Sequence, residues 1–161
     1  MATTTCIFLL GRSVVAIDYL TQGSKVIVHD DVSALACHAG HLYYACKGHL
    51  YSYRIADKTT KVIASTVGTR PNAIYIDRRG TVWVAAVNGL YTLSTKTRRL
   101  TPRLSGPYIE YIFQDSHGNI WASSRDRGCY RIASDGTITQ FSVDENTAKA
   151  ENNNAVQHNK D

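Results

Sequence analysis

Short apolar segments alternate with Gly, Asp and Asn turns along the chain, and no segment has the period of an amphipathic helix. The clearest segment begins at Asn72 and reads N-A-I-Y-I-D-R-R-G-T-V-W-V-A-A-V-N-G-L-Y-T-L. Its Val, Ile, Tyr and Trp residues favour β-strands, and the breaks between them are typical turn residues. The pattern predicts strands near residues 72–77, 81–86, 90–94 and 98–101.

The same pattern recurs from Ile109 as I-E-Y-I-F-Q-D-S-H-G-N-I-W-A-S-S-R-D-R-G-C-Y-R-I. The matching pairs are Asp77 and Asp115, Gly80 and Gly118, and Trp83 and Trp121, each 38 residues apart, and Gly89 and Gly128, which are 39 apart. A weaker copy begins at Ala34, and a partial copy that lacks its first strand opens the chain.

Four-stranded antiparallel units of about forty residues in tandem are typical of β-propeller blades. The sequence therefore predicts an all-β protein, a β-propeller of about four four-stranded antiparallel blades. The expected blades are a partial one at 6–30 and others at 31–68, 69–104 and 105–142, followed by a polar linker at 143–153 and the start of a further repeat at 154–161. An irregular β-sandwich is the alternative fold, but it does not explain the constant spacing.

The repeated D-x-x-G-x-x-W positions have a structural explanation. Asp77 and Asp115 can accept backbone N–H bonds across a tight turn. Gly80 and Gly118 can adopt the left-handed conformation that such a turn needs. We expect Trp83 and Trp121 to pack between neighbouring sheets. Together with Gly89 and Gly128, these positions are interpreted as scaffold, with no catalytic role.

In a propeller, the loops between second and third strands and the connections between blades share one face. Function concentrates on such loops. The candidate ligand-binding residues there are Lys47, His49, Arg70, Asn88, Tyr108, Arg125, Asp126 and Arg127. Their basic groups and the Tyr108 ring would suit a partly anionic sugar or an acidic peptide. The competing and more common interpretation is that they are ordinary solvated loop residues.

The composition narrows the classes of protein to which the chain can belong. The chain has 161 residues, 43% hydrophobic and 19% charged, which suits one globular domain. Its net charge is +5, but the sequence contains no run of five like charges. Nucleic-acid binding is therefore not expected. No apolar run approaches the roughly 18 residues of a membrane helix, so no membrane contact by this segment is expected.

The four cysteines, Cys6, Cys37, Cys46 and Cys129, lack C-x-x-C spacing. They are expected to be small buried apolar residues rather than metal ligands, and no cofactor is predicted.

The segment I-Y-I-D-R-R-G-T-V-W-V-A-A-V-N-G-L-Y-T-L resembles the two-component regulator propeller repeat, and the resemblance extends over residues 6–142. The fourth copy departs from it after Trp121, with Cys129 where Leu is usual. The resemblance implies the extracytoplasmic input domain of a bacterial hybrid histidine kinase, or a fragment of it. That domain would be a periplasmic, non-enzymatic sensing module. Its implied partners are a glycan or other anionic small ligand and the rest of a longer sensor chain.

Other hypotheses remain open. A protein-interaction scaffold is one, and an enzyme similar to streptogramin lyases is another. The lyases need an acid/base His and a carboxylate metal site in the central channel, whereas His38, His41 and His117 fall in or beside turns on the opposite face. The expected blades are also compatible with two arrangements. The favoured one is a fragment of a larger propeller, and the other is a four-bladed ring closed by a strand at 154–158 pairing with residues 7–28.

Overall fold

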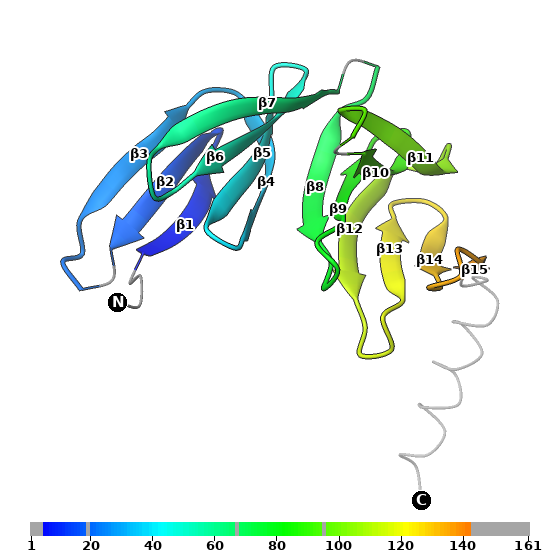
Figure 1. Cartoon of the computed structure of the whole chain (residues 1–161). Helices are drawn as coiled ribbons and strands as arrows, with labels where there is room; N and C mark the ends of the chain where they lie inside the picture. The colour runs from blue at the N-terminus through cyan, green and yellow to red at the C-terminus, as the bar shows by residue number, and fades with distance from the viewer. Residues whose placement is uncertain (1–4, 19, 67, 95, 143–161) are drawn as a thin grey trace, which may run out of the picture.

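The computed structural model describes residues 5–18, 20–66, 68–94 and 96–142. These residues form fifteen strands in four antiparallel sheets, which follow one another as blades along an open arc (Figure 1). The prediction of an all-β propeller fold is confirmed. The predicted linker at 143–153 and the predicted strand at 154–158 lie outside the described residues.

The blades follow the chain in order. Blade 1 contains β1 (Thr5–Leu10), β2 (Ser13–Asp18) and β3 (Ser24–His29). Blade 2 contains β4 (Val32–His38), β5 (His41–Cys46), β6 (His49–Arg54) and β7 (Thr59–Ser65). Blade 3 contains β8 (Pro71–Ile76), β9 (Val82–Ala86), β10 (Gly89–Ser94) and β11 (Arg99–Ser105). Blade 4 contains β12 (Ile109–Gln114), β13 (Ile120–Ser124), β14 (Gly128–Ile132) and β15 (Ile138–Phe141).

Within each blade every strand pairs with the next one in sequence. The first strands β4, β8 and β12 pack next to one another on the inner side of the arc. Blade 1 has three strands. Its β1–β2 pair corresponds to the pairs β5–β6, β9–β10 and β13–β14 of the other blades. Blade 1 therefore lacks the innermost strand that the other blades have, within the part of the chain described.

Three apolar clusters lie between consecutive blades and hold the arc together. Val14 of blade 1 packs with Leu42 and Tyr44 of blade 2. Leu50 of blade 2 packs with Val84 of blade 3 in the second cluster. The third joins blade 3 to blade 4 and contains Trp83, Ala85, Leu90, Ile109, Ile112, Ile120, Ala122, Tyr130 and Ile132. Because side chains alternate across a strand, each inner blade buries one face against the preceding blade and the other against the following one.

The D-x-x-G turn is joined to the Trp by a direct hydrogen bond. Asp77 Oδ1 accepts the backbone N–H groups of Arg79 and Thr81 at 2.9 and 2.8 Å. Its Oδ2 accepts the indole N–H of Trp83 at 2.9 Å. Asp115 repeats the arrangement, and its Oδ2 accepts from Trp121 at 2.8 Å. The backbone bonds agree with the turn predicted from the sequence, and the indole bond, which was not predicted, makes Asp and Trp one structural unit.

The two Trp residues differ in burial, which corrects one expectation. Trp83 is 8% exposed, inside the cluster between blades 3 and 4. Trp121 is only half-buried, because no described blade follows blade 4 to cover it. Its indole instead stacks between Phe113 and Phe141, with ring centroids 6.2 and 5.5 Å away.

Two further expectations need correction. Strand β11 continues through Pro102 to Ser105, beyond the predicted end at 101. A proline is tolerated there because β11 is the outer strand of its sheet and has a free edge. Of the four cysteines, only Cys46 is buried, whereas Cys6 and Cys37 are exposed and Cys129 is half-buried. Cys6 and Cys129 lie in blades 1 and 4, each of which has one neighbouring blade among the described residues.

Candidate ligand-binding face

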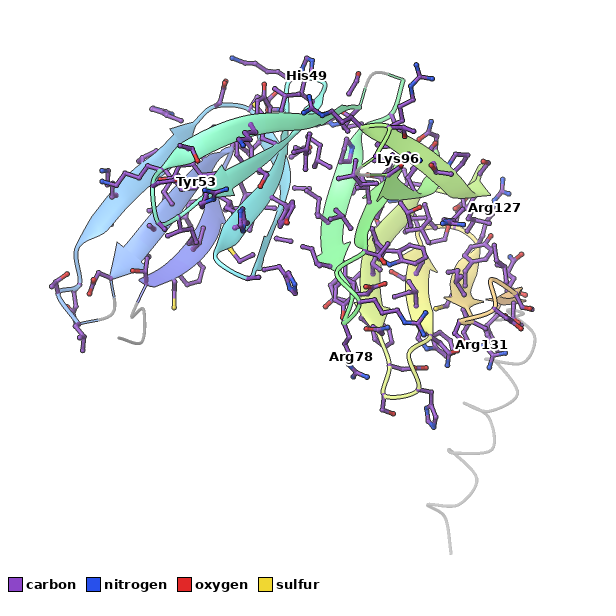
Figure 2. All side chains as sticks on the ribbon, in the orientation of Figure 1. His49, Tyr53, Arg78, Lys96, Arg127 and Arg131 are labelled. Atoms are coloured by element: carbon purple, nitrogen blue, oxygen red, sulfur yellow. The ribbon has the colours of Figure 1, made fainter. Side chains whose placement is uncertain are left out.

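The strand order places one set of connections at a single end of every blade. We call this end the loop face. It comprises the turns β1–β2, β5–β6, β9–β10 and β13–β14 and the connections between consecutive blades. In Figure 2, His49 lies at this end of blade 2, and Arg78 lies at the opposite end of blade 3. The predicted ligand-binding residues all belong to the loop face.

A groove of about 570 Å³ opens on the loop face, where the inner strands begin. Residues from all four blades line it. They are Leu9, Gly11, Arg12, Asp31, Val32, Ser33, Arg70, Pro71, Asn72, Val87, Tyr108 and Glu110. The groove is thus built by the arrangement of the blades, since no single blade supplies its walls.

Two of the predicted residues, Arg70 and Tyr108, line this groove. Arg125 lies beside them, with its guanidinium carbon 4.1 Å from the centre of the Tyr108 ring. Arg125 Nε also pairs with Glu110 Oε1 at 2.7 Å. The Tyr108 hydroxyl donates to Asn72 Oδ1 at 3.4 Å. Stacking and hydrogen bonding therefore hold the Tyr108 ring in place at the groove.

Lys47 belongs to a neighbouring hollow of about 270 Å³, whose walls also include Arg12, Asp31 and Arg70. Lys47 Nζ pairs with Asp30 Oδ1 at 2.6 Å. This contact lowers the pKa of Asp30 and raises the pKa of Lys47, because the hydrogen bond, and then the opposite charge of the partner, stabilise each ionised group. The His49 ring bonds to the Lys47 carbonyl at 3.1 Å and lines neither hollow.

The structure does not bring Asn88, Asp126 or Arg127 into the groove. Asn88 accepts from the Thr69 hydroxyl at 2.6 Å and donates to the Gly68 carbonyl at 3.0 Å, so it braces the connection between blades 2 and 3. Asp126 accepts from the Ser124 hydroxyl at 3.0 Å and lies 3.7 Å from Arg127 Nε. The two Asp126 contacts stay within blade 4, at the β13–β14 turn.

Five polar residues of the groove were missed at the sequence level: Arg12, Asp31, Ser33, Asn72 and Glu110. Arg12 Nε pairs with Asp31 Oδ1 at 2.9 Å. Asn72 donates to the Ile109 carbonyl at 3.0 Å, which links the inner strands of blades 3 and 4. Arg12 occupies the β1–β2 turn, the counterpart of the Lys47 turn. The loop between the second and third strands of the partial blade at 6–30 therefore contained the signal for Arg12.

Acidic partners offset most of the basic charge on this face. Lys47, Arg12 and Arg125 each pair with a carboxylate, at Asp30, Asp31 and Glu110 respectively. Arg70 is exposed and has no ion pair among the described residues. The groove therefore presents donors and acceptors side by side, a pattern that suits a polar ligand rich in hydroxyl groups.

The histidines named for a lyase-like site do not reach this groove. The His41 ring bonds to the Ala39 carbonyl at 3.1 Å, and His38 and His117 lie at the same end of their blades as His41, away from the loop face. Among the described residues, no group of three or more His, Cys, Asp or Glu could hold a metal ion. The same residues contain no helix long and apolar enough to cross a membrane.

Comparison with known proteins finds similarity in structure. No family model and no curated protein matches the sequence. The structure is similar to the extracellular domain of the putative hybrid two component system BT4673 from B. thetaiotaomicron. The TM-score is 0.73 at 15% identity, over 89% of this chain and 21% of that one. The chain therefore spans about a fifth of the length of that domain.

Other propellers also match. A catalytically inactive virginiamycin B lyase from Staphylococcus aureus, solved with quinupristin, has a TM-score of 0.65 at 14% identity, over 90% of this chain and 58% of that one. TolB from Acinetobacter baumannii has a TM-score of 0.65 at 18% identity, over 80% and 37%. At these identities the likeness shows a shared propeller fold. Among the proteins with that fold are extracellular domains of two-component systems and a lyase.

Proposed function

We propose that the chain is a non-enzymatic ligand-binding segment of a sensor propeller and that its ligand binds in the groove of the loop face. The observation that carries the proposal is the convergence of Arg12, Arg70, Asn72 and Tyr108, from two blades and two connections between blades, on one groove of about 570 Å³. A pocket of this size with a few polar groups suits a small ligand.

The proposed ligand is a glycan. Asn72 and the Arg12–Asp31 pair present amide, guanidinium and carboxylate groups, which can bond to vicinal hydroxyls as both donors and acceptors. Arg70, which has no ion pair in the part of the chain that the structure describes, adds a preference for a carboxylate or sulfate substituent on the sugar. The local ion pairs make a highly anionic ligand a poorer fit than the net charge alone indicates.

The extracytoplasmic location and a role inside a longer sensor chain are part of the proposal. They are supported by the likeness to the extracellular domain of a two-component system, of which this chain matches 21%. The likeness to virginiamycin B lyase favours an enzyme instead. Among the described residues, no His lines the groove, and the acidic residues of its lining are Asp31 and Glu110, both already paired with Arg. These observations support binding over catalysis.

A glycan array probed with the full chain tests the proposal. The array carries neutral, uronic-acid and sulfated oligosaccharides. We expect specific binding that Arg70→Ala weakens by roughly tenfold or more, corresponding to the loss of one charge-assisted contact. Arg54→Ala removes the same charge at the other end of blade 2 and is the matched control. If Arg70→Ala leaves binding unchanged, the groove is not the ligand-binding site. An array without binding, together with a protein partner found by pull-down, would favour the scaffold hypothesis.

A further inference from the structure

A second hollow opens between blades 3 and 4, at the end of the blades opposite the loop face. Its volume is about 370 Å³, and we call it the turn-side hollow. The β8–β9 turn and strand β11 of blade 3 form one side, and the β12–β13 and β14–β15 turns of blade 4 form the other. Its lining includes the apolar residues Trp83, Ile120 and Ile132 and the cations Arg79 and Arg103. Among the described residues, it shares no lining residue with the groove of the loop face.

The contact between blades 2 and 3 has a smaller hollow of about 240 Å³ at the same end. Residues at equivalent repeat positions line the two hollows, among them the pairs Tyr43 and Trp83, Ser52 and Thr92, and Val82 and Ile120. A hollow at this place is therefore a consequence of how two blades pack. What distinguishes one hollow from the other is the set of residues that the repeat does not share.

The clearest difference between the two hollows is Arg103. Ile63 occupies the equivalent position, 40 residues earlier, and lines the smaller hollow. The register of each outer strand skips this residue, so each stands in a β-bulge, a feature that redirects a side chain. Arg103 Nε donates to the hydroxyl oxygen of Thr92, a buried residue, at 3.0 Å. The bulge and this bond together hold the guanidinium at the turn-side hollow.

Hydrogen bonds between the turns of blades 3 and 4 brace the turn-side hollow. Gln114 Oε1 accepts the backbone N–H of Arg78 at 3.0 Å, and its Nε2 donates to the Gly118 carbonyl at 3.1 Å. The guanidinium of Arg78, labelled at this end of blade 3 in Figure 2, donates to the Ser116 carbonyl at 3.3 Å. The repeat position of Gln114 is occupied by Ile76 in blade 3, whose side chain cannot make these bonds. The turn-side hollow is thus held in shape before any ligand binds, which lowers the cost of binding.

We propose that the turn-side hollow is a second binding site and that it takes a small aromatic carboxylate. Arg79 and Arg103 have no ion pair among the described residues. The carboxylate of Asp77 also lines the hollow, but its oxygens already accept the turn N–H groups and the indole N–H of Trp83. The two guanidinium groups bind the carboxylate of the ligand, and the apolar walls contact its ring. The proposal does not depend on the glycan or on the groove of the loop face.

Proton–nitrogen NMR of the full chain locates the binding, because its two Trp residues give two indole N–H signals. The probes are 2-naphthoate and its uncharged amide, 2-naphthamide, and Trp121→Phe assigns the signals. We expect 2-naphthoate to shift the Trp83 signal saturably, with a dissociation constant on the order of 1 mM or below. The amide should bind roughly tenfold more weakly, because it lacks the charge. No saturable shift of the Trp83 signal up to about 10 mM, or equal affinity for the two probes, would overturn the proposal.

Arg103→Ile tests the charge contact, because it introduces the residue that the smaller hollow has at this position. It should weaken 2-naphthoate about tenfold and leave the affinity for 2-naphthamide unchanged. Lys61→Ala removes a cation that lines the smaller hollow and is the matched control. Thermal melting verifies folding, and Arg79→Ala, at an exposed turn residue, replaces Arg103→Ile if that variant does not fold. The carboxylate contact is rejected if Lys61→Ala weakens 2-naphthoate as much, or if Arg103→Ile weakens both probes equally.

Discussion

Blades 3 and 4 share the D-x-x-G-x-x-W motif but differ in their surroundings. In blade 3, every residue of β9 is buried, because blades 2 and 4 cover its two faces. In blade 4, the equivalent strand β13 is buried on alternate residues only. Asp77 and Asp115 nevertheless make the same three bonds to their turns and indoles.

The comparison separates contacts made within one blade from contacts made between blades. The turn and its bond to the Trp are local, because the Asp acceptor and the indole donor lie six residues apart on one hairpin. Burial of the Trp comes from the neighbouring blade. A repeat motif therefore specifies how a blade is built, and the position of the blade in the arc decides how strongly each motif residue contributes to stability.

The largest predicted effect is at the two tryptophans. Trp83→Ala should lower the free energy of unfolding by about 3–5 kcal/mol, since it empties a packed site. Trp121→Ala should cost roughly half as much, because one side of the indole is already open to water. Urea denaturation measures both, and each variant keeps the other Trp as its fluorescent reporter.

Trp83→Phe is the matched control, because it keeps most of the packing and loses the bond to Asp77. Equal costs for the two Ala variants at low protein concentration would mean that another element covers Trp121.

The second prediction concerns Gly89 and Gly128, the glycines that open the third strands. A Cβ at Gly89 would collide with the carbonyl oxygen of Leu104, and one at Gly128 with that of Phe141. Gly89→Ala should destabilise by about 2 kcal/mol or more, through strain that the packed blade cannot relieve. Gly128→Ala should cost less, since blade 4 packs against a described blade on one face only and its β15 can move more easily than β11 of blade 3. A larger loss of melting temperature for Gly128→Ala would contradict this order.

The third prediction tests the Asp–Trp bond. In Asp77→Asn, the amide oxygen can still accept from the backbone, but the amide N–H₂ group faces the indole donor. Leaving that buried donor unpaired should cost about 1–3 kcal/mol. Asp115→Asn should have a smaller effect, because water reaches the more open Trp121. Thermal melting of the two variants at pH 7 gives the comparison, and Trp83→Phe should make Asp77→Asn less costly.

The same carboxylates predict how stability depends on pH. For Asp77, burial raises the pKa, but the bonds from Trp83, Thr81 and Arg79 outweigh it and the net pKa is lowered. For Asp115, bonds from Trp121 and Asn119 hold the pKa well below its ordinary value of 3.8. A lowered folded-state pKa gives stability that is complete above about 3.8 and lost as pH falls below it.

The melting temperature should therefore be nearly constant from pH 7 to 5 and fall between about pH 4 and 2. Asp115→Asn should flatten this fall, because the variant has no carboxylate to protonate at that turn. An unchanged acid slope in this variant would show that other carboxylates dominate, among them Asp18, Asp57 and Asp135, whose pKa values are also lowered.

The smallest effect on stability is predicted for the loop arginines. Replacing Arg70, Arg125 and Arg127 together with Ala should leave the melting temperature almost unchanged, because all three are exposed. Glycan binding should weaken, and the wild-type signal should fall as salt rises. Among single variants, Arg70→Ala should weaken binding most and Arg127→Ala least. The opposite order would move the ligand from the groove to the rim of blade 4.

The sequence by itself determined the blades, their strand order and the two Asp turns. Each of these rests on contacts within about forty residues, and local alternation and turn chemistry report such contacts directly. The path of β11 through Pro102 was missed because only the sheet order reveals a free edge.

Only the tertiary structure decided the burial of Trp121 and the composition of the groove. Arg12, Asn72 and Glu110 come from three different blades, and their proximity depends on the angle between sheets. The pairing of Arg12 with Asp31 likewise depends on how adjacent loops meet. A repeat pattern contains no information on these contacts, because the repeat describes one blade and the groove belongs to the space between blades.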